Sequence, residues 1–234
     1  PDVVVNCAAY NLVDRAEAEP SSAMAVNAWG VRELARWCGR NDRLLVHFST
    51  DHVFGIDTDR GPPYRESDPP GPVSVYGLSK LAGEYLVRSL CPRHLILRTS
   101  GLYGLRGTGG KGTNFVETVL RLAREGRPLR IVDDQVCTPT NAADLARATL
   151  DLIHQGRTGL FHRTNDGRCS WYAFASAVLE MAGLPQRPEP ISTAAYGAAA
   201  RRPGWSVLAS TLPPLRSWRS ALADHLEQRA RLRG

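Results

Sequence analysis

The sequence predicts an α/β fold in which helices cover a doubly wound, parallel sheet and a smaller lobe follows. Continuous apolar runs recur along the chain, as in DVVVNCAA, RLLVHFST and RHLILRTS, and such runs are typical of strands buried on both faces. Segments with helical spacing of apolar residues separate these runs. This alternation is the pattern of βαβ units, whose connections are right-handed and whose sites lie at the carboxyl ends of the strands.

Each expected element follows from its own stretch of sequence. The expected strands cover residues 2–9, 43–50, 93–100, 129–135 and 159–165. The first three of these strands are expected to be parallel neighbours. A helix carrying Tyr76 and Lys80 follows a proline-rich loop, and other helices are expected at residues 21–40, 114–126 and 142–155. Ser21 or Ser22 is the expected N-cap of the first helix.

Chain length and local composition set the domain organisation. A chain of 234 residues with 43% hydrophobic content suits one sizeable α/β domain with a small appended lobe. From about Ser170 onward, shorter helices and Pro-rich loops predominate. We therefore expect residues 1–168 to form the sheet domain with a strand-end active site. Residues 169–234 are expected to form a smaller substrate-binding lobe that is interleaved with the sheet domain.

Composition excludes several classes of function. The net charge of +6 would suit an anionic partner, but the arginines do not form aromatic-interleaved patches, so nucleic-acid binding is not expected. No apolar stretch approaches the roughly 18 residues of a membrane span, so a cytoplasmic protein without membrane contact is expected. The cysteines are odd in number and form no CxxC pair, which argues against a disulfide framework and a zinc site. They are Cys7, Cys38, Cys91, Cys137 and Cys169.

The stretch SVYGLSK carries the strongest chemical signal. Tyr76 and Lys80 are four residues apart, so on a helix both side chains lie on the same face. A phenol has a pKa of about 10, and a neighbouring ammonium would move that pKa toward the working range. Ser49 or Thr50, at the end of the neighbouring strand, could share a substrate carbonyl oxygen with Tyr76. Such a site would protonate an oxygen as hydride arrives at carbon; the alternative is a surface helix turn beside an ordinary strand end.

Polar residues gather where the expected strands end, which supports the catalytic interpretation. They are Asn6, Ser49, Thr50, Asp51, Thr99 and Ser100.

Ordered blocks of sequence resemble the dTDP-4-dehydrorhamnose reductase family, within the extended short-chain dehydrogenase/reductase superfamily. The blocks include PDVVVNCAAYNLVDRAEAEPSSAMAVNAWGV, VHFSTDHVFG, YRESDPPGPVSVYGLSKLAGE, LILRTSGLYG, NFVETVLRLA, DQVCTPT and RRPGWSVL. The resemblance covers nearly the whole chain. It implies a Rossmann-like enzyme that uses NADPH or NADH to reduce the 4-keto group of a nucleotide-sugar, dTDP-4-dehydrorhamnose, in the supply of surface polysaccharide.

The resemblance also implies roles for individual residues. Tyr76 would be the proton donor, Lys80 would bind the nicotinamide ribose and tune Tyr76, and Thr50 would be the third catalytic residue. The residues expected at the cofactor are Ala8, Ala9, Tyr10, Ser49, Tyr76, Lys80 and Thr99. His52, Asn114 and Arg202 would face the nucleotide-sugar. A homodimer is left open as the assembly.

Two departures from the family pattern affect these expectations. The family begins with a strand, a GxxGxxG phosphate turn and a helix, whereas this chain starts at what resembles the fourth strand. We therefore expect an N-terminally truncated sheet, and weak dinucleotide binding by the chain alone. His52 and Gly101 stand where relatives usually have aromatic residues, which leaves the sugar nucleotide less defined than the reaction.

Structural alternatives stand beside several of these roles. Asn114 could be a helix cap, Arg202 could belong to a solvated basic turn with Arg201, and His52 could have only a structural role. Two other functions also remain open. The chain could be a catalytically silent binding or regulatory relative, or a related epimerase or dehydratase in which Asp51 is the acidic residue.

Overall fold

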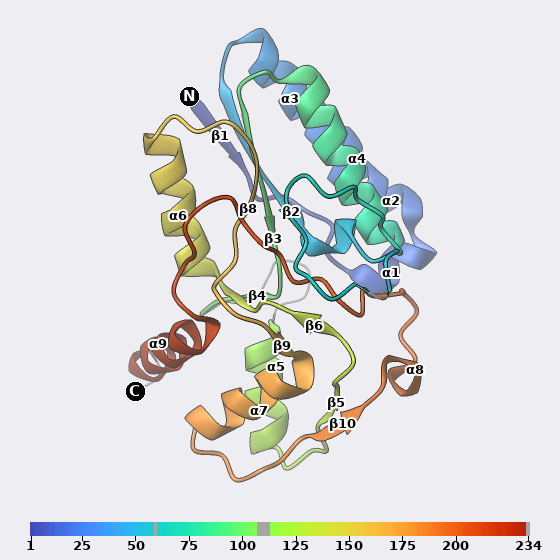
Figure 1. The fold of residues 1–234 in the computed structure, drawn as a ribbon, viewed down its shortest axis with the longest axis vertical. Helices are drawn as coiled ribbons and strands as arrows, with labels where there is room; N and C mark the ends of the chain where they lie inside the picture. The colour runs from blue at the N-terminus through green and yellow to red at the C-terminus, as the bar shows by residue number, and fades with distance from the viewer. Residues whose placement is uncertain (59, 107–112, 233–234) are drawn as a thin grey trace.

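The computed structural model describes residues 1–58, 60–106 and 113–232, and in it a four-stranded parallel sheet forms the upper part of the molecule (Figure 1). The strand order is β1 (Val3–Asn6), β2 (Leu44–Thr50), β3 (His94–Thr99) and β8 (Gly159–His162). All three neighbouring pairs are parallel. The predicted α/β class and the parallel arrangement of the first three strands are therefore confirmed.

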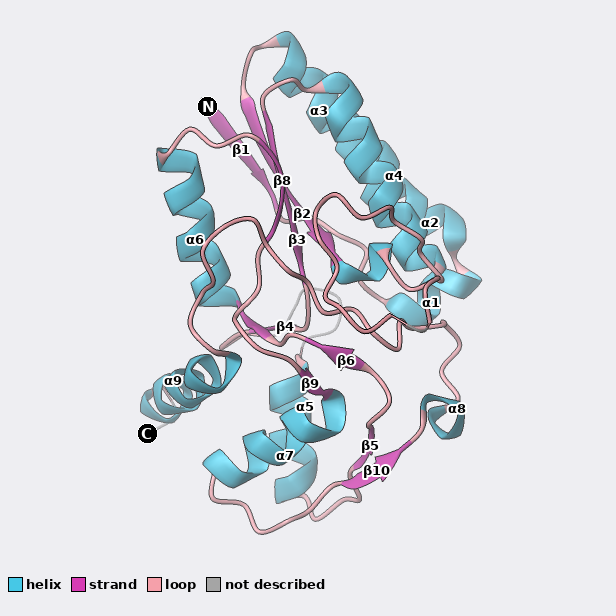
Figure 2. Cartoon of the chain, viewed as in Figure 1, coloured by secondary structure: helices cyan, strands magenta, loops and turns pink. Residues whose placement is uncertain are grey.

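Helices cover both faces of this sheet (Figure 2). On one side lie α2 (Pro20–Met24), the π-helical turn η1 (Ala25–Gly30), α3 (Val31–Arg40) and α4 (Val75–Leu90), and on the other lies α6 (Ala142–His154). Leu45 and Ile96 pack toward α3 and α4, whereas Val46 and Leu97 pack toward Leu152 of α6. This alternation follows from the two-residue period of a strand.

The first long helix departs from its expected start. Pro20 occupies the first position of α2, and Glu19 is its N-cap without a side-chain hydrogen bond. The expectation of Ser21 or Ser22 as the cap is therefore wrong. Proline suits the first turn because its missing N–H would have had no helical partner there. By contrast, Ser74 caps α4 through a hydrogen bond that its Oγ accepts from the Gly77 N–H at 3.2 Å.

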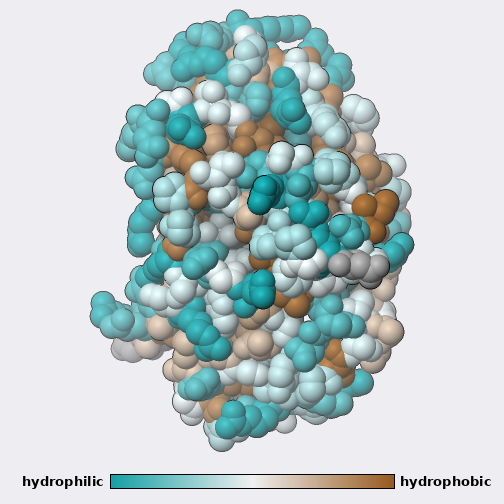
Figure 3. Space-filling view, viewed as in Figure 1, coloured by the Kyte–Doolittle hydropathy of each residue, from teal (hydrophilic) through white to brown (hydrophobic). Residues whose placement is uncertain are grey.

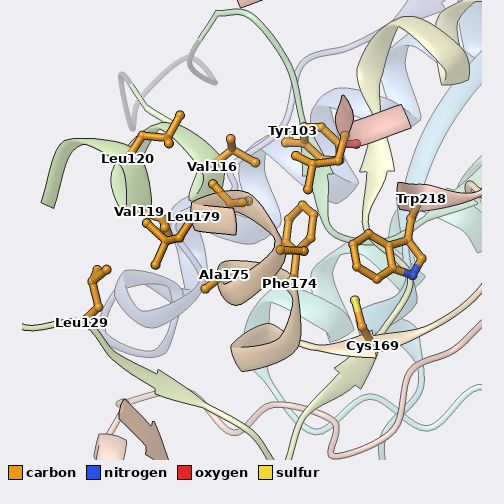
Figure 4. Close-up of a cluster of buried hydrophobic side chains, with 13 residues drawn as sticks. Tyr103, Val116, Val119, Leu120, Leu129, Cys169, Phe174, Ala175, Leu179 and Trp218 are labelled. Atoms are coloured by element: carbon orange, nitrogen blue, oxygen red, sulfur yellow. The ribbon is translucent and has the colours of Figure 1, made fainter. Parts of the chain in front are cut away.

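A second hydrophobic core lies among the helices drawn below the sheet in Figure 1, and Figure 4 shows its side chains. It joins α5 (Phe115–Arg124), α7 (Trp171–Met181) and α9 (Trp218–Arg231) around the fully buried Phe174. Helix α5 comes from the first 168 residues and α7 and α9 come from the rest, so the expected division at residue 168 runs through a shared core. The division itself remains a proposal.

Short strands complete the lower lobe. Strand β5 (Arg130–Val132) pairs with β10 (Glu189–Ile191) rather than joining the main sheet, because the segment before it has already crossed into the lobe. Strands β4 (Leu102–Tyr103) and β7 (Thr140–Asn141) form a parallel pair, and β6 (Val136–Cys137) and β9 (Cys169–Ser170) form an antiparallel pair. The remaining elements are α1 (Val13–Ala18), the 3₁₀ turn η2 (Asp51–Val53) and α8 (Thr193–Tyr196).

The surface residues and the helix lengths complete the description of the fold. On the face drawn in Figure 3, hydrophilic residues cover much of the surface and hydrophobic ones form small groups. No helix in the described part of the chain combines the length and apolar character needed to cross a bilayer. Among the same residues, no cluster of His, Cys, Asp or Glu suits a metal ion.

Candidate active site

The predicted catalytic residues meet at the carboxyl end of the sheet. Thr50 is the last residue of β2 and lies in register with Thr99 of β3. Helix α4 approaches this strand end closely, because a Cβ atom added to Gly77 would lie 2.2 Å from the main-chain oxygen of His52. Only glycine permits that approach, which brings the first turn of α4, with Tyr76, beside the turn that follows Thr50. The His52 and Tyr76 rings pack edge to face with their centroids 5.5 Å apart.

The structure shifts the pKa of Tyr76 in the direction opposite to our expectation. Burial raises that pKa to about 12, the Thr50 hydroxyl opposes the shift by hydrogen bonding, and the charge of Asp51 adds to it. Lys80 does not offset this shift because its ammonium is directed at the strand instead. Tyr76 is therefore held as a neutral phenol at neutral pH.

Lys80 is buried against β2. Its Nζ donates to the main-chain oxygen of Phe48 at 2.6 Å, and its side chain is only 3% exposed. Burial lowers the pKa of Lys80 to about 8, while the nearby Glu84 carboxylate raises it. Within the described part of the chain this bond uses one of the three N–H groups on the ammonium, which leaves two for a ligand.

Asp51 connects the ends of two strands with the lower lobe. Its carboxylate accepts hydrogen bonds from Thr50 at 3.2 Å, from Ser100 at 2.7 Å and from Ser206 at 2.5 Å. The side chain is 5% exposed. The sequence placed Asp51 among the polar strand-end residues and as the possible acid of a dehydratase. It did not predict the bonds to the two serines, because these lie 49 and 155 residues away and no local pattern connects them.

Ser49 belongs to a buried ion-pair network instead of the strand-end site. Its Oγ donates to Glu84 at 2.5 Å, and Arg98 binds the same carboxylate through Nε at 2.8 Å and Nη2 at 2.6 Å. Alternation along β2 directs Ser49 toward α4. The hydroxyl that we expected at the cofactor is thus engaged elsewhere, and of the two candidates at this strand end only Thr50 reaches Tyr76.

The loop after β1 presents small residues at the same edge of the sheet. Ala8 and Ala9 are exposed, and the Ala8 N–H is held by Asn6 Oδ1 at 3.1 Å. Tyr10 is fixed by Asn27, which accepts from its N–H and donates to its carbonyl, both at 2.9 Å. Asn27 is fully buried in the π-helical turn and also donates to Ser79 of α4 at 2.9 Å. It therefore ties the loop to the catalytic helix, and sequence reasoning missed it.

The hydroxyl of Thr99 is a candidate contact for a bound ligand. Its Oγ1 is buried and has no hydrogen-bond partner among the residues that the structure describes. It lies at the same strand edge as Thr50, with which Thr99 is in register, and the loop that carries the accessible Ala8 and Ala9 follows β1 at this edge. A nicotinamide with its ribose supplies both donors and acceptors, so these residues fit that group.

Two cavities lie beside the predicted catalytic residues. The smaller, of about 100 Å³, is lined by Asp51, His52, Cys137 and Ser206, among others. The larger, of about 340 Å³, is lined mainly by apolar residues of α5, β5 and α7, including Phe115. Gln135, Trp171 and Arg202 line both cavities, so the two adjoin at these side chains. None of the sequence patterns pointed to Gln135 or Trp171.

The predicted substrate residues differ in how freely they face these cavities. Asn114 caps α5, since its Oδ1 accepts from the Glu117 N–H at 3.1 Å and its Nδ2 donates to Gly104 at 2.7 Å. Its side chain is therefore engaged as the helix-cap alternative requires. Arg202 lines both cavities and at the same time binds Asp14 through Nη1 at 3.0 Å and Nη2 at 2.7 Å. It is not a solvated basic turn.

Gly101, the second departure from the family pattern, has a backbone reason. Its φ of 54° is left-handed, a conformation that side chains with a Cβ rarely adopt. A Cβ there would also lie 3.0 Å from Pro139 Cα.

Comparison with characterised proteins places this site in a family context. A family profile described as the RmlD substrate binding domain matches residues 1–231. The chain is 43% identical over 231 residues to the dTDP-4-dehydrorhamnose reductase of Mycolicibacterium smegmatis, covering 95% of this chain and 69% of the relative. It is 41% identical over 237 residues to the spore coat polysaccharide biosynthesis protein SpsK of Bacillus subtilis, covering 98% and 80%.

Solved structures agree with this assignment. The dTDP-4-dehydrorhamnose reductase of Bacillus anthracis in complex with NADP superposes with a TM-score of 0.91 at 37% identity, covering 97% of this chain and 81% of that one. A dTDP-glucose 4,6-dehydratase of Streptomyces venezuelae, with a TM-score of 0.80 at 20% identity and coverage of 100% and 74%, shares the fold. The chain therefore belongs to the dTDP-4-dehydrorhamnose reductase family and contains its RmlD substrate-binding domain.

Proposed function

We propose that the protein reduces the 4-keto group of dTDP-4-dehydrorhamnose to give dTDP-rhamnose, with NADPH or NADH as the reductant. The observation that carries this proposal is the convergence of Thr50, Tyr76 and Lys80 at one strand end of a chain from this family. The family relatives named as this reductase, one of them solved with NADP, support the substrate and the cofactor. When bound, the reduced nicotinamide supplies a hydride to the carbonyl carbon.

Tyr76 is proposed as the proton donor. Its pKa of about 12 keeps the phenol protonated at neutral pH. As the carbonyl carbon is reduced, the carbonyl oxygen gains negative charge and takes the Tyr76 proton, which leaves a phenolate that is reprotonated from water. Thr50, within hydrogen-bond reach of Tyr76, would hold the phenol oxygen in place beside the carbonyl oxygen.

Lys80 is proposed to hold the nicotinamide ribose. The bond to Phe48 fixes its Nζ, and its pKa of about 8 leaves it mainly protonated at neutral pH. Ala8, Ala9 and Tyr10 would line the cofactor, because the first two are accessible and the third is fixed by Asn27. Thr99 would donate its unpartnered hydroxyl to the same group.

The substrate is proposed to span the two adjoining cavities. The sugar would lie in the small cavity against His52, within reach of Tyr76. The nucleotide would occupy the larger cavity, where Phe115 and Trp171 offer ring faces to a base. Arg202, between the cavities, would face the diphosphate, since a guanidinium binds phosphate through paired N–H groups. Asn114 would shape this wall through the first turn of α5 rather than by a free amide.

The dehydratase alternative requires Asp51 to donate a proton. Asp51 instead accepts hydrogen bonds from three hydroxyls, which is the arrangement of an ionised carboxylate. The alternative of a catalytically silent relative is tested directly by turnover.

Consumption of NADPH or NADH by the purified protein, with and without dTDP-4-dehydrorhamnose, is the decisive measurement. Sugar-dependent oxidation with formation of dTDP-rhamnose is expected. Cofactor oxidation that stays at the background rate with saturating substrate would favour the silent relative. Release of water from a dTDP-hexose without net cofactor oxidation would favour a dehydratase.

We also propose a cytoplasmic location and a homodimer. All five cysteines are free, as in a reducing compartment. Large apolar side chains are exposed on η1, α3 and α4, namely Trp29, Trp37, Leu78 and Tyr85. Such side chains on neighbouring helices suit a contact between copies. Analytical ultracentrifugation should give a dimer that Trp37→Arg converts to a monomer, and cell fractionation should recover the protein in the soluble cytoplasmic fraction.

A further inference from the structure

The carboxylate of Asp51 accepts hydrogen bonds from its neighbour Thr50 and from two serines far away in the sequence. Oδ1 accepts from Thr50 at the end of β2, and Oδ2 accepts from Ser100 after β3 and from Ser206 in the C-terminal segment. Ser100 and Ser206 are 2% and 5% exposed. This arrangement is more than a local turn, because two of the three donors are far away in sequence and all are shielded from water.

The bonds around Thr50 fix its hydroxyl. Thr50 is the N-cap of η2, and its Oγ1 accepts from the His52 N–H at 3.2 Å while donating to Asp51. A hydroxyl has one proton and two acceptor positions. With its proton directed at Asp51 and one acceptor position taken by His52, the Thr50 oxygen has one acceptor position left, and Tyr76 lies within hydrogen-bond reach.

Main-chain hydrogen bonds fix the position of Ser206 in the lower lobe. Its N–H donates to the Val136 oxygen at 2.9 Å, and the Val136 N–H donates to the Gly204 oxygen at 2.8 Å. The segment around Ser206 thus runs beside β6, to which an isolated parallel bridge between Val136 and Trp205 also joins it. The position of the Ser206 hydroxyl is therefore set by main-chain bonds of the lobe that also contains Arg202.

We propose that Asp51 and Ser206 are positioning residues for the reduction, through which the C-terminal segment fixes the orientation of the Thr50 hydroxyl beside Tyr76. Asp51 holds the hydroxyl, and Ser206 holds Asp51. This proposal rests on the proposed function for its kinetic consequence, but the orientation of Thr50 is a property of the chain alone. Neither residue needs to touch the reacting atoms.

The kinetic test uses Ser206→Ala with a serine from the same segment as its control. Ser210 also donates to a carboxylate, that of Glu66 at 3.2 Å, but away from the catalytic residues. Removing a group that orients a catalytic residue lowers activity on the order of 10- to 100-fold. We expect Ser206→Ala to lower kcat about 10-fold, and Asp51→Asn more, with KM for NADPH unchanged. Ser206→Thr, which keeps a hydroxyl, should recover most of kcat, and Ser210→Ala should resemble the wild type.

A second readout does not depend on turnover. In protein labelled at threonine methyl groups, the Thr50 signal is assigned from its loss in Thr50→Ser. We expect this signal to shift in Asp51→Asn and in Ser206→Ala, to return toward its original position in Ser206→Thr, and to stay in place in Ser210→Ala. A Thr50 signal that does not move in the folded Ser206→Ala variant overturns the proposal, whether or not the enzyme is active.

The two readouts separate the possible failures. A wild-type protein that turns over no substrate overturns the proposed function, while the Thr50 signal still decides the positioning proposal. An active wild type whose kcat is unchanged by Ser206→Ala overturns the positioning proposal and leaves the proposed function standing. A fall in kcat that Ser206→Thr does not recover overturns it as well, because the hydroxyl is then not the group that matters.

Discussion

The Nζ atom of Lys80 lies 2.6 Å from the main-chain oxygen of Phe48, and Tyr76 lies one helical turn before it on α4. The lysine is thus fixed to β2 while the phenol reaches the strand end beside Thr50. Burial lowers the pKa of Lys80 and raises the pKa of Tyr76. The pair therefore combines an ammonium that can titrate near neutrality with a phenol that stays protonated.

The depressed pKa of Lys80 should be visible directly. The lysines of the chain are Lys80 and Lys111, so a spectrum with isotope-labelled lysine is simple to assign with Lys80→Met. We expect the Lys80 side-chain signal to titrate near its pKa of about 8. A Lys80 signal that titrates only near the usual value of about 10.4 would contradict the buried position.

The same shift predicts a pH dependence of stability. The folded-state pKa of about 8 is below the usual 10.5, so between these pH values the unfolded chain binds more protons than the folded one. Raising the pH from 8 to 10.5 should therefore increase the contribution of Lys80 to the free energy of unfolding. Denaturant melts across this window should show the rise in the wild type, and Lys80→Met should lack that contribution. If the free energy of unfolding changed with pH equally in both proteins, Lys80 would not be the cause of the pH dependence.

Tyr76→Phe should remove the proton donor and little else. General acid catalysis contributes about 10² to 10⁴ in rate, so we expect kcat to fall at least 100-fold while KM for NADPH changes little. Steady-state kinetics provide the measurement, and Tyr85→Phe, an exposed tyrosine on the same helix, is the control. A raised KM with an unchanged kcat would show that Tyr76 binds ligand without donating a proton.

The buried pair of Glu84 and Arg98 should be costly to break. Their side chains are 1% and 3% exposed, and removing one partner leaves a buried charge without compensation. We expect Glu84→Gln to lower the free energy of unfolding by about 3–5 kcal/mol. The exposed pair Arg121 and Glu125 provides the control, because Glu125→Gln should change stability by less than about 0.5 kcal/mol. Urea melts compare the two, and equal effects would contradict the difference in burial.

Gly77 should tolerate no side chain. An added Cβ would lie 2.2 Å from the His52 oxygen, so Gly77→Ala should push the first turn of α4 away from Thr50 and lower both stability and kcat. Gly61→Ala is the matched control, since a Cβ there meets nothing within 4 Å. Melting curves and turnover of both variants test this, and a Gly77→Ala protein with wild-type kcat would show that the close approach is not needed.

The sequence by itself determined the parallel sheet and the helix face that Tyr76 and Lys80 share. Continuous apolar runs such as VVVN and LLVHFST can be buried on both faces only in a covered sheet, and that requirement is local. The four-residue spacing of Tyr76 and Lys80 likewise places them on one helix face without reference to the rest of the fold. Polar residues at strand ends then predicted where the site lies.

The tertiary structure decided what those residues contact. The pKa of Tyr76 rises because of burial and the charge of Asp51, neither of which can be derived from the spacing to Lys80. Ser49 and Thr50 are adjacent in sequence, yet the fold gives one to Glu84 and the other to Asp51. Ser206 reaches Asp51 across 155 residues, because hydrogen bonds and burial are made between segments that only folding brings together.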